Sequence, residues 1–557
     1  MTKYIKGAKK MRVFMLLSIT LIGNLSAQEL SKPKLVVGIV VDQMRQEYLF
    51  RYKDLFGDDG FNRLLNHGFE LKNTHYNFIP TKTGPGHASI YTGTTPKNHS
   101  IILNEWYDRK VKKEINCVED HTVSTVGSSS QKGEFSPHLL LSPTITDQLK
   151  IATQGRSKVI SLSLKNRGAI LPGGHTADGA YWYDSSNGNF VTSTFYLDKL
   201  PDWVLRFNQK KWADKYLDGM WKPLFPKERY TAGLKDDAAS EILFPNSLKS
   251  VLPYNLADWS IEEKDEKGKS ITSYDLLQKT PFGNSILKKL ALSAINNEKL
   301  GQNGETDFLA ISFSSTDKVG HAFGPQSVEL QDTYARLDQD LAEIFVTLDA
   351  KVGKGNYVVF LTSDHGVAEN LHFMKSKSIT AGFHNEDDIK GKLNAVLENK
   401  FNTSHLIEHF SDGQLYFNLE ALSTNNLSKS EIIETTYTFL ADLPEVSDIL
   451  LADDLRRFNY SESQKKMVQR GYHWHRSGDL TVLYQSNFTK QKDFGAEHGS
   501  GFAYDSHVPL LWYGWKIPHG HSYKYQSVTD IVPTLAFMLE IKLPDAVTGQ
   551  PILEILD

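Results

Sequence analysis

The chain has very little cysteine: Cys117 is the only one among 557 residues. A single thiol excludes an intramolecular disulfide, whatever the redox state of the compartment. Cys117 also lies too far from the N-terminus to be a lipid-anchor cysteine. A metal site built from several thiolates is excluded too, so the ligands of any metal have to come from histidine and aspartate.

Long runs of one charge are also missing. The chain has 62 basic and 66 acidic residues and a formal net charge of −4. It has no basic block of the kind that nucleic-acid binders carry, and no long acidic tail. We find no internal repeat at the periods of solenoid proteins. These absences argue against a nucleic-acid-binding or repeat protein.

The N-terminus has the pattern of a secretory signal peptide. A basic segment precedes an apolar stretch, 13–22, which is too short to span a bilayer, and Leu25-Ser-Ala27 is a plausible cleavage site. A short membrane anchor is the alternative, and translation from Met11 would give a more usual basic segment. Residues 1–27 carry five positive and no negative charges, so the mature charge would be −4 − 5 = −9. We expect a periplasmic or secreted protein with no stable membrane insertion after cleavage.

Strand-like apolar runs alternate with helical patterns along most of the chain. This alternation predicts an α/β fold with a mainly parallel sheet and helices on both faces. The clearest helix has an apolar stripe from Leu330 to Leu348 at steps of three and four. Another helix is expected after Thr-Pro-Phe-Gly-Asn at 280–284.

Two long stretches fit this alternation poorly. They run from about 185 to 280 and from about 370 to 485. We interpret residues 28–557 as one α/β domain in which these two insertions form a cap beside the site. The oligomeric state cannot be read from the sequence.

Acidic residues and histidines recur where the predicted strands end. They are Asp42, Asp317, His321, Asp364, His365 and His498. In open α/β sheets, ligands collect at the carboxyl ends of the strands. Three carboxylates and three imidazoles suffice for two tetrahedral metal sites of mixed nitrogen and oxygen type. One Asp-His pair alone is often an ordinary surface feature, but the six residues together predict a two-metal hydrolase.

A hydroxyl residue stands at the start of a glycine-rich segment. Thr83 is followed by Gly-Pro-Gly and then by a helical stretch. A hydroxyl at a helix N-terminus faces free N–H groups and the positive end of the helix dipole, which favours an attacking alkoxide and an incoming phosphate. The alternative is that Thr83 is only an N-cap residue. Beside the predicted metal sites, Thr83 is the candidate nucleophile, because metal coordination can activate it without a dedicated base.

Two cations follow the strand-like run Val159–Leu164. Lys165 and Arg167 would point the same way if this segment stays extended, and together they would hold a dianionic phosphoryl group. The alternative is a solvated strand end. Asn104 could donate an amide N–H to a phosphoryl oxygen, although asparagine in a turn is usually structural.

Four segments together are typical of one enzyme superfamily. They are Thr-Gly-Pro-Gly-His-Ala-Ser at 83–89, Leu-Lys-Asn-Arg-Gly-Ala at 164–169, Ser-Thr-Asp-Lys-Val-Gly-His at 315–321 and Ser-Asp-His-Gly at 363–366. With them, the chain resembles the alkaline phosphatase superfamily of two-zinc hydrolases from Lys34 to the C-terminus. Within it, the chain is similar to the phosphate-irrepressible periplasmic alkaline phosphatases, which use a threonine nucleophile.

The resemblance implies a role for each matching residue. One zinc ion would be held by Asp317, His321 and His498. The other would be held by Asp42, Asp364 and His365, with Thr83 at its open position. The phosphoryl oxygens would contact Asn104, Lys165 and Arg167. Because the Lys/Arg pair replaces a third, magnesium site of other alkaline phosphatases, no catalytic magnesium is expected.

The implied reaction is the hydrolysis of small-molecule phosphate monoesters through a phospho-threonine intermediate, with release of inorganic phosphate. Broad specificity is expected because all of this recognition targets the phosphoryl group. Zinc follows from ligand type and resemblance, and manganese, iron or cobalt would also suit such ligands.

Several other interpretations remain open. The nearest is a phosphodiesterase or nucleotide pyrophosphatase of the same superfamily, which typically lacks the Lys/Arg pair. A sulfatase would need a Cys or Ser in a Cys-x-Pro-x-Arg motif, whereas Cys117 stands in Asn-Cys-Val-Glu. A phosphoglycerate mutase relative would normally be cytosolic and act on sugar phosphates, whereas this chain is predicted to be exported. A non-enzymatic zinc- or phosphate-binding protein would be supported by a broken ligand set, which we do not see. His473 and His475 could form an extra metal site, but they are more simply explained as residues that line or flank the cap.

Overall fold

The computed structural model describes residues 32–244, 247–259, 263–264, 270–271, 273–490 and 494–556. The predicted signal segment, 1–27, lies outside the described residues.

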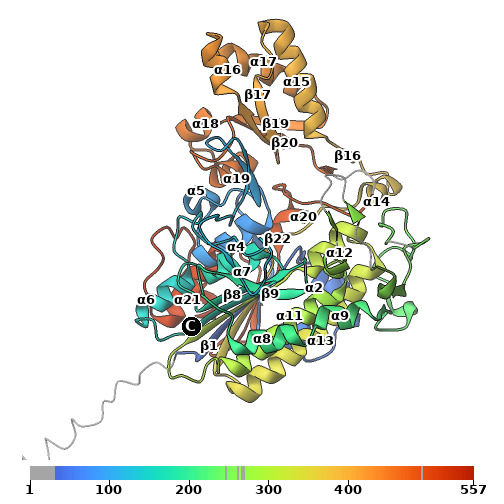
Figure 1. Ribbon diagram of the computed structural model, residues 1–557, viewed down its shortest axis with the longest axis vertical. Coiled ribbons are helices and arrows are strands. Elements are labelled where there is room, and N and C mark those ends of the chain that lie inside the picture. The colour runs from blue at the N-terminus through green and yellow to red at the C-terminus, as the bar shows by residue number, and fades with distance from the viewer. Residues whose placement is uncertain are drawn as a thin grey trace, which may run out of the picture.

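A ten-stranded sheet forms the centre of the molecule (Figure 1). Its strands run in the order β24 (Gly520–Ser522), β2 (Phe69–Leu71), β23 (Leu510–Gly514), β15 (Tyr357–Thr362), β1 (Leu35–Val41), β14 (Asp307–Phe313), β7 (Val159–Ser163), β8 (Gly179–Asp184), β9 (Asn189–Ser193) and β6 (Thr125–Val126). The five strands from β15 to β8 are parallel. Most pairs outside them are antiparallel. The predicted α/β fold with a mainly parallel centre is confirmed.

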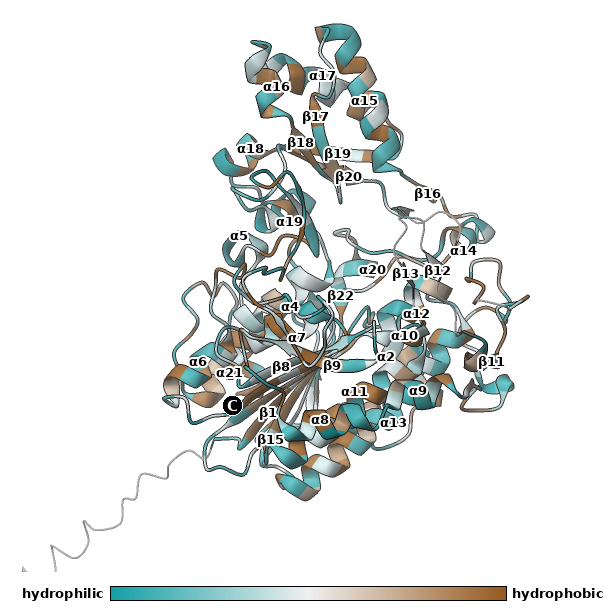
Figure 2. Ribbon diagram, viewed as in Figure 1, coloured by the Kyte–Doolittle hydropathy of each residue, from teal (hydrophilic) through white to brown (hydrophobic). Residues whose placement is uncertain are grey.

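The sheet is buried on both faces, as the continuous apolar sequence of β1 indicates. Because side chains alternate across a strand, Val37 and Ile39 enter the core on one face. Val36 and Val40 enter the core on the other face. Figure 2 shows the strands as a brown band with mixed-colour helices around them.

Two predicted helices on the first face are confirmed. α11 (Pro281–Asn297) begins where the hydroxyl of Thr280 accepts a hydrogen bond from the N–H of Phe282. α13 (Val328–Lys351) begins with the equivalent bond from the N–H of Leu330 to Ser327. The apolar stripe of α13 packs into the same core as α11. No helix in the described part of the chain is long and apolar enough to cross a membrane.

The apolar run Val508–Trp512 is not one strand. It divides into β22 (His507–Val508) and β23, which belong to different sheets. Pro509 stands between them and has no N–H to donate to a sheet, which explains the interruption.

The stretch 185–280, expected as part of a cap, largely packs into the main core. α8 (Asp202–Gln209) and α9 (Trp212–Leu217) lie against α11. Trp203, Phe207 and Leu217 are buried in the same core as the sheet. Its Trp and Tyr content therefore reflects core packing rather than a separate layer.

The stretch 370–485 contains a small domain with its own sheet and core. Four strands pair in the order β17 (Ile407–Ser411), β18 (Gln414–Phe417), β20 (Leu480–Tyr484) and β19 (Val446–Leu451). Two helices, α15 (Glu386–Phe401) and α17 (Lys429–Ala441), pack on this sheet. Figure 1 shows the domain in orange at the top, apart from the central sheet.

A candidate dinuclear metal centre

The carboxyl ends of the parallel strands meet at one edge of the sheet. Val41 of β1 pairs with Phe313 of β14, and Val40 pairs with Thr362 of β15. The residues that follow each strand are therefore neighbours, although they are far apart in the sequence. This register places Asp42 beside Asp364.

Six residues at this edge form two clusters in which the ligand atoms lie within 4.8 Å of one another. One cluster contains Asp317, His321 and His498. The other contains Asp42, Asp364 and His365. The clusters have the membership that the family resemblance implies.

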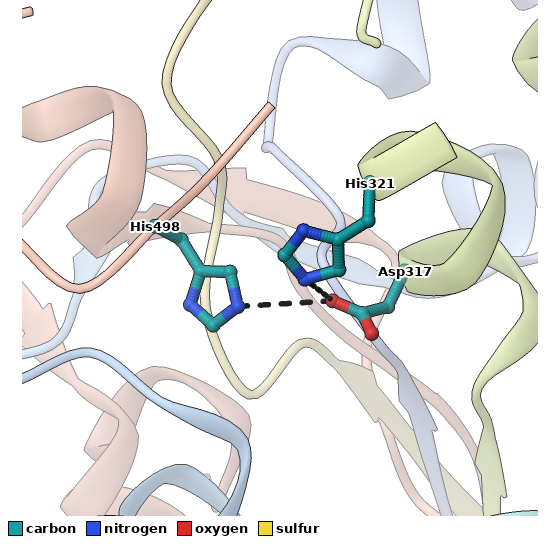
Figure 3. Close-up of side chains that lie close together, drawn as sticks. All are labelled: Asp317, His321 and His498. Carbon is teal, nitrogen blue, oxygen red and sulfur yellow. Dashed lines mark ion pairs between the residues drawn. The ribbon is translucent and has the colours of Figure 1, made fainter. Parts of the chain in front are cut away.

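The first cluster is built on a short helix and a distant loop. Asp317 and His321 lie four residues apart on α12 (Ser315–Phe323), so they share one face of the helix. Nε2 of His321 lies 3.0 Å from Oδ1 of Asp317, and Nε2 of His498 lies 3.8 Å from the same oxygen. Figure 3 shows the three side chains converging on one point.

Backbone carbonyls fix the tautomer of all three histidines. Nδ1 of His321 lies 2.7 Å from the carbonyl of Ala496. Nδ1 of His365 lies 2.8 Å from the carbonyl of Gly366, and Nδ1 of His498 lies 2.8 Å from that of Thr81. Because a carbonyl only accepts, each Nδ1 carries a proton, so Nε2 is the nitrogen that binds a metal when the ring is neutral. This is the orientation in which imidazole binds a metal.

The charges of the buried carboxylates Asp42 and Asp364 are only partly compensated by neighbouring groups of the chain. Neither oxygen of Asp42 has a well-directed hydrogen bond in the described part of the chain, although Nζ of Lys165 lies 2.6 Å from Oδ2. Burial and then the carboxylates of Asp317 and Asp364 raise the pKa of Asp42 to about 7. Burial raises the pKa of Asp364 to about 6. Neighbouring carboxylates with unpaired oxygens and three inward lone pairs fit a site for divalent cations.

The pKa of Asp317 shifts in the opposite direction to those of Asp42 and Asp364. Burial would raise its pKa, but His321 and then Lys165 hold the pKa well below its usual value. Nζ of Lys165 lies 2.6 Å from Oδ2 of Asp317. Lys165 therefore bridges the two clusters.

Thr83 is the first residue of α4 (Thr83–Thr92) and is buried beside the second cluster. Its Oγ1 lies 3.4 Å from Nε2 of His365 and 3.4 Å from Nζ of Lys165. The N-cap position belongs to Lys82, and no side chain caps the helix. The interpretation of Thr83 as an N-cap residue is therefore wrong, and its hydroxyl faces the centre.

Asn104 is held beside the start of α4, and Arg167 lies in the segment that follows Lys165. Oδ1 of Asn104 accepts a hydrogen bond of 2.7 Å from the N–H of Gly84, which leaves the amide NH₂ group to donate elsewhere. The segment after β7 does not stay extended, because α7 (Asn166–Gly173) begins directly after Lys165. The expected strand-like alternation of Lys165 and Arg167 is thus wrong. Nε of Arg167 is buried without a hydrogen-bond partner among the described residues.

Two supporting residues were missed in the sequence. Nε2 of Gln43 donates to Oδ1 of Asp317 at 2.9 Å, and its backbone N–H donates to Oδ1 of Asp364 at 3.2 Å. Nδ1 of His87 lies 2.9 Å from the carbonyl of Thr83. In the sequence, only their positions could have pointed to a supporting role. Gln43 directly follows Asp42, and His87 follows Thr83 by one helical turn. Neither His473 nor His475 joins a cluster.

The comparisons with known proteins agree with this geometry. Residues 36–500 match the family described as type I phosphodiesterase / nucleotide pyrophosphatase. The chain is 41% identical to alkaline phosphatase PafA of Elizabethkingia meningoseptica, over 96% of this chain and 97% of that protein. It is 38% identical to a calcium-transporting ATPase of Myroides odoratus, over 96% of both chains. It is 40% identical to alkaline phosphatase PhoV of Synechococcus elongatus, over 95% of this chain and 94% of that one.

A solved structure is also similar. The crystal structure of wild-type PafA matches with a TM-score of 0.90 and 40% identity, over 94% of this chain and 99% of that chain.

Proposed function

Because the chain belongs to the type I phosphodiesterase / nucleotide pyrophosphatase family, within the alkaline phosphatase superfamily, we propose that it is an alkaline phosphatase acting on phosphate monoesters. One observation carries this proposal: the hydroxyl of Thr83 lies 3.4 Å from Nε2 of His365, a candidate metal ligand, and 3.4 Å from Nζ of Lys165. A buried hydroxyl with a cation beside it suits attack on a phosphoryl group.

Two zinc ions fit the nitrogen and oxygen donors, and no catalytic magnesium is needed in this proposal. Asp317, His321 and His498 would hold one ion, and Asp42, Asp364 and His365 would hold the other. When bound, they would supply the positive charge that lowers the pKa of the nucleophile and stabilises the leaving oxygen. Nζ of Lys165 lies 2.6 Å from a carboxylate oxygen of each cluster, so the chain itself supplies one positive charge beside both.

The residues of the chain carry the remaining steps. Oγ1 of Thr83 attacks phosphorus, the bond to the ester oxygen breaks, and the alcohol leaves. A phospho-threonine forms and water then hydrolyses it, which regenerates the hydroxyl and releases inorganic phosphate. Lys165 and Arg167 hold the charged phosphoryl oxygens, and the NH₂ group of Asn104 donates to one of them. Lys165 thus passes from the carboxylates to the substrate as the site fills.

The alternative is a phosphodiesterase or nucleotide pyrophosphatase, which the family name also covers. A monoester presents more charged oxygens than a diester. Two buried or half-buried cations at the phosphoryl position, Lys165 and Arg167, therefore favour the monoester. Since the recognition elements address the phosphoryl group, the proposed specificity for the alcohol is broad.

The small domain within 370–485 is proposed as a cap over this centre. A pocket beside His498 is lined on its other side by residues of β20 and by Asp412, between β17 and β18. The proposed cellular site is the periplasm or the outside of the cell, reached through the predicted signal peptide at 1–27.

The test is to assay the zinc-loaded mature protein on a phosphate monoester and a matched diester at alkaline pH, alongside Thr83→Ala. The proposal expects a strong monoester preference that collapses in Thr83→Ala. A diester preference would refute the role given to Lys165 and Arg167. No activity on either ester, with zinc bound, would favour a binding protein.

A further inference from the structure

A second pocket lies between the core and the small domain, and its lining includes none of the residues of the metal centre. It has a volume of about 300 Å³, which is within the range of small-molecule sites. One wall is β4 (Glu105–Asp108) and the turn after it. The opposite wall is formed by α18 (Ala452–Arg457) and residues 472–479. We call it the Trp474 pocket; it contains part of the His-Trp-His segment.

The charge of this pocket is opposite to that of the whole chain. Its lining has five basic side chains and two acidic ones, whereas the chain has a net charge of −4. The basic residues are Arg109, Lys110, Lys429, Arg456 and Arg476. The acidic residues, Asp108 and Asp479, are partly committed, since Asp479 pairs with Arg109 at 2.8 Å and with Lys429 at 3.4 Å. Arg456 has a partner outside the lining, with Nη1 3.9 Å from Oδ1 of Asp453, so the remaining excess of positive charge is carried by Lys110 and Arg476.

Arg476 is the clearest part of that excess. Its Nη1 donates to the carbonyls of Ser100 and Leu139, at 2.8 and 2.9 Å, and its guanidinium lies 4.9 Å from the ring centre of Trp106. Within the described ranges it makes no ion pair with a carboxylate. Burial lowers the pKa of Arg476 to about 10. Asp108 attracts this cation without forming an ion pair with it, so an anionic ligand would offset the cost of burial more fully.

The rim of the pocket is aromatic. Trp474 is 69% exposed although it is one of the largest side chains. A single exposed indole needs no explanation by itself. Here it lines a basic pocket, with its ring centre 5.2 Å from that of His475, and the half-exposed side chain of Arg456 lines the same pocket. A flat exposed ring next to cations is how proteins hold a base and its phosphate.

We propose that the Trp474 pocket binds a nucleoside monophosphate, separately from the metal centre. The base stacks on Trp474, and the phosphate is held by Arg476, with Arg456 at the rim. A simple anion would leave the indole unused, and a neutral aromatic compound would leave the cations unused. A long nucleic acid is disfavoured by the net negative charge of the rest of the chain.

The experiment titrates AMP, adenosine and inorganic phosphate separately into the metal-loaded, full-length mature Thr83→Ala protein by calorimetry. The same titrations of Thr83→Ala/Trp474→Ala report what the metal centre alone binds. In the pocket, adenosine and inorganic phosphate should each bind at least tenfold more weakly than AMP. Trp474→Ala should weaken AMP at least fivefold, the lower end of what stacking of one base contributes. Arg456→Gln should weaken AMP but not adenosine.

Two variants serve as matched controls. Phe458→Ala removes a similarly exposed ring and Arg457→Gln a neighbouring exposed cation, both outside the lining, and neither should change AMP binding. Arg476→Met is compared only after its melting temperature is checked, because Arg476 also holds two carbonyls. If adenosine binds as tightly as AMP, or if Trp474→Ala binds AMP like its parent, the proposal is wrong. None of these outcomes depends on the protein being a phosphatase.

Discussion

The imidazole rings of His365 and His498 are stacked, with centres 3.5 Å apart and planes 9° from parallel. The two residues belong to different candidate metal clusters. Each is held at Nδ1 by a different backbone carbonyl, so neither ring can turn without breaking a hydrogen bond. The stacked rings therefore fix the positions of the two clusters relative to each other.

Replacing His498 should disturb both clusters. We expect His498→Ala to lose one bound metal and to weaken the second by about tenfold, the scale seen when a supporting contact of a ligand is removed. Metal content after dialysis against graded zinc measures both effects. His519→Ala, which removes an exposed histidine, should retain both metals. Full occupancy in His498→Ala would contradict the assignment.

Gln43 should act through Asp317 rather than on the substrate. Its amide holds Oδ1 of Asp317 at 2.9 Å, so Gln43→Ala should lower metal affinity by about 10- to 100-fold. Activity should recover when zinc is raised, which separates loss of positioning from loss of chemistry. Gln46→Ala is the control, because Gln46 is also buried but donates to Glu70. Activity that excess zinc does not restore would argue against this role.

Lys165 should matter more for monoesters than for diesters. We expect Lys165→Met to lower kcat/KM for a monoester by about 10²- to 10³-fold, the usual scale for losing one charge-stabilising donor. The loss for a diester should be smaller because a diester has fewer charged oxygens. Lys158→Met is the control, since Lys158 precedes the same strand at its opposite end and pairs with Glu298. Equal losses on both esters would contradict the proposal.

The stability of the protein should depend on the apolar stripe of α13, which packs against the sheet. Leu341 of α13 is fully buried, so Leu341→Ala should destabilise the protein by about 2–5 kcal/mol. Val346 lies on the same helix but is 58% exposed, and Val346→Ala should change the stability by about 0.5 kcal/mol or less. Chemical unfolding measured on both variants tests the difference, and similar losses would refute the packing argument.

His99 should make the fold sensitive to acid. Burial is the largest cause that lowers its pKa from 6.5 to about 3, and its Nδ1 accepts a hydrogen bond of 3.1 Å from the N–H of Ile101. Between these two pKa values the unfolded chain binds a proton that the folded chain does not. Stability therefore falls as the pH decreases below 6.5, by up to about 1.4 kcal/mol per pH unit from this group.

His99→Asn removes this titration. Its stability at neutral pH should be lower, because the buried bonds to Ser89 and Ile101 change. Its decline between pH 6 and pH 4 should nevertheless be shallower than that of the parent, as measured by chemical unfolding at several pH values. Parallel profiles would show that another group controls the acid sensitivity.

Much of the core was readable from the sequence because its signals are local. The seven-residue apolar run at β1 indicated a strand covered on both faces, and the stripe of α13 indicated a helix on one of them. Local sequence patterns did not predict the structure correctly where contacts with other parts of the chain determine it. The packing of Trp203 and Phe207 into the main core, and the turn into α7 after Lys165, depend on segments far away in the chain.

The sequence by itself determined where the six candidate ligands stand, because parallel strands bring their carboxyl ends to one edge and Asp42 and Asp364 follow such strands. Only the tertiary structure decided how the ligands face the centre. The proton on each histidine is fixed by carbonyls such as those of Thr81 and Ala496, which no local pattern links to His498 or His321. The same holds for the Trp474 pocket, since its lining residues come from segments far apart in the chain. Hydrogen bonds and charges between distant segments leave no periodic signal in the chain, so they become visible only when it is folded.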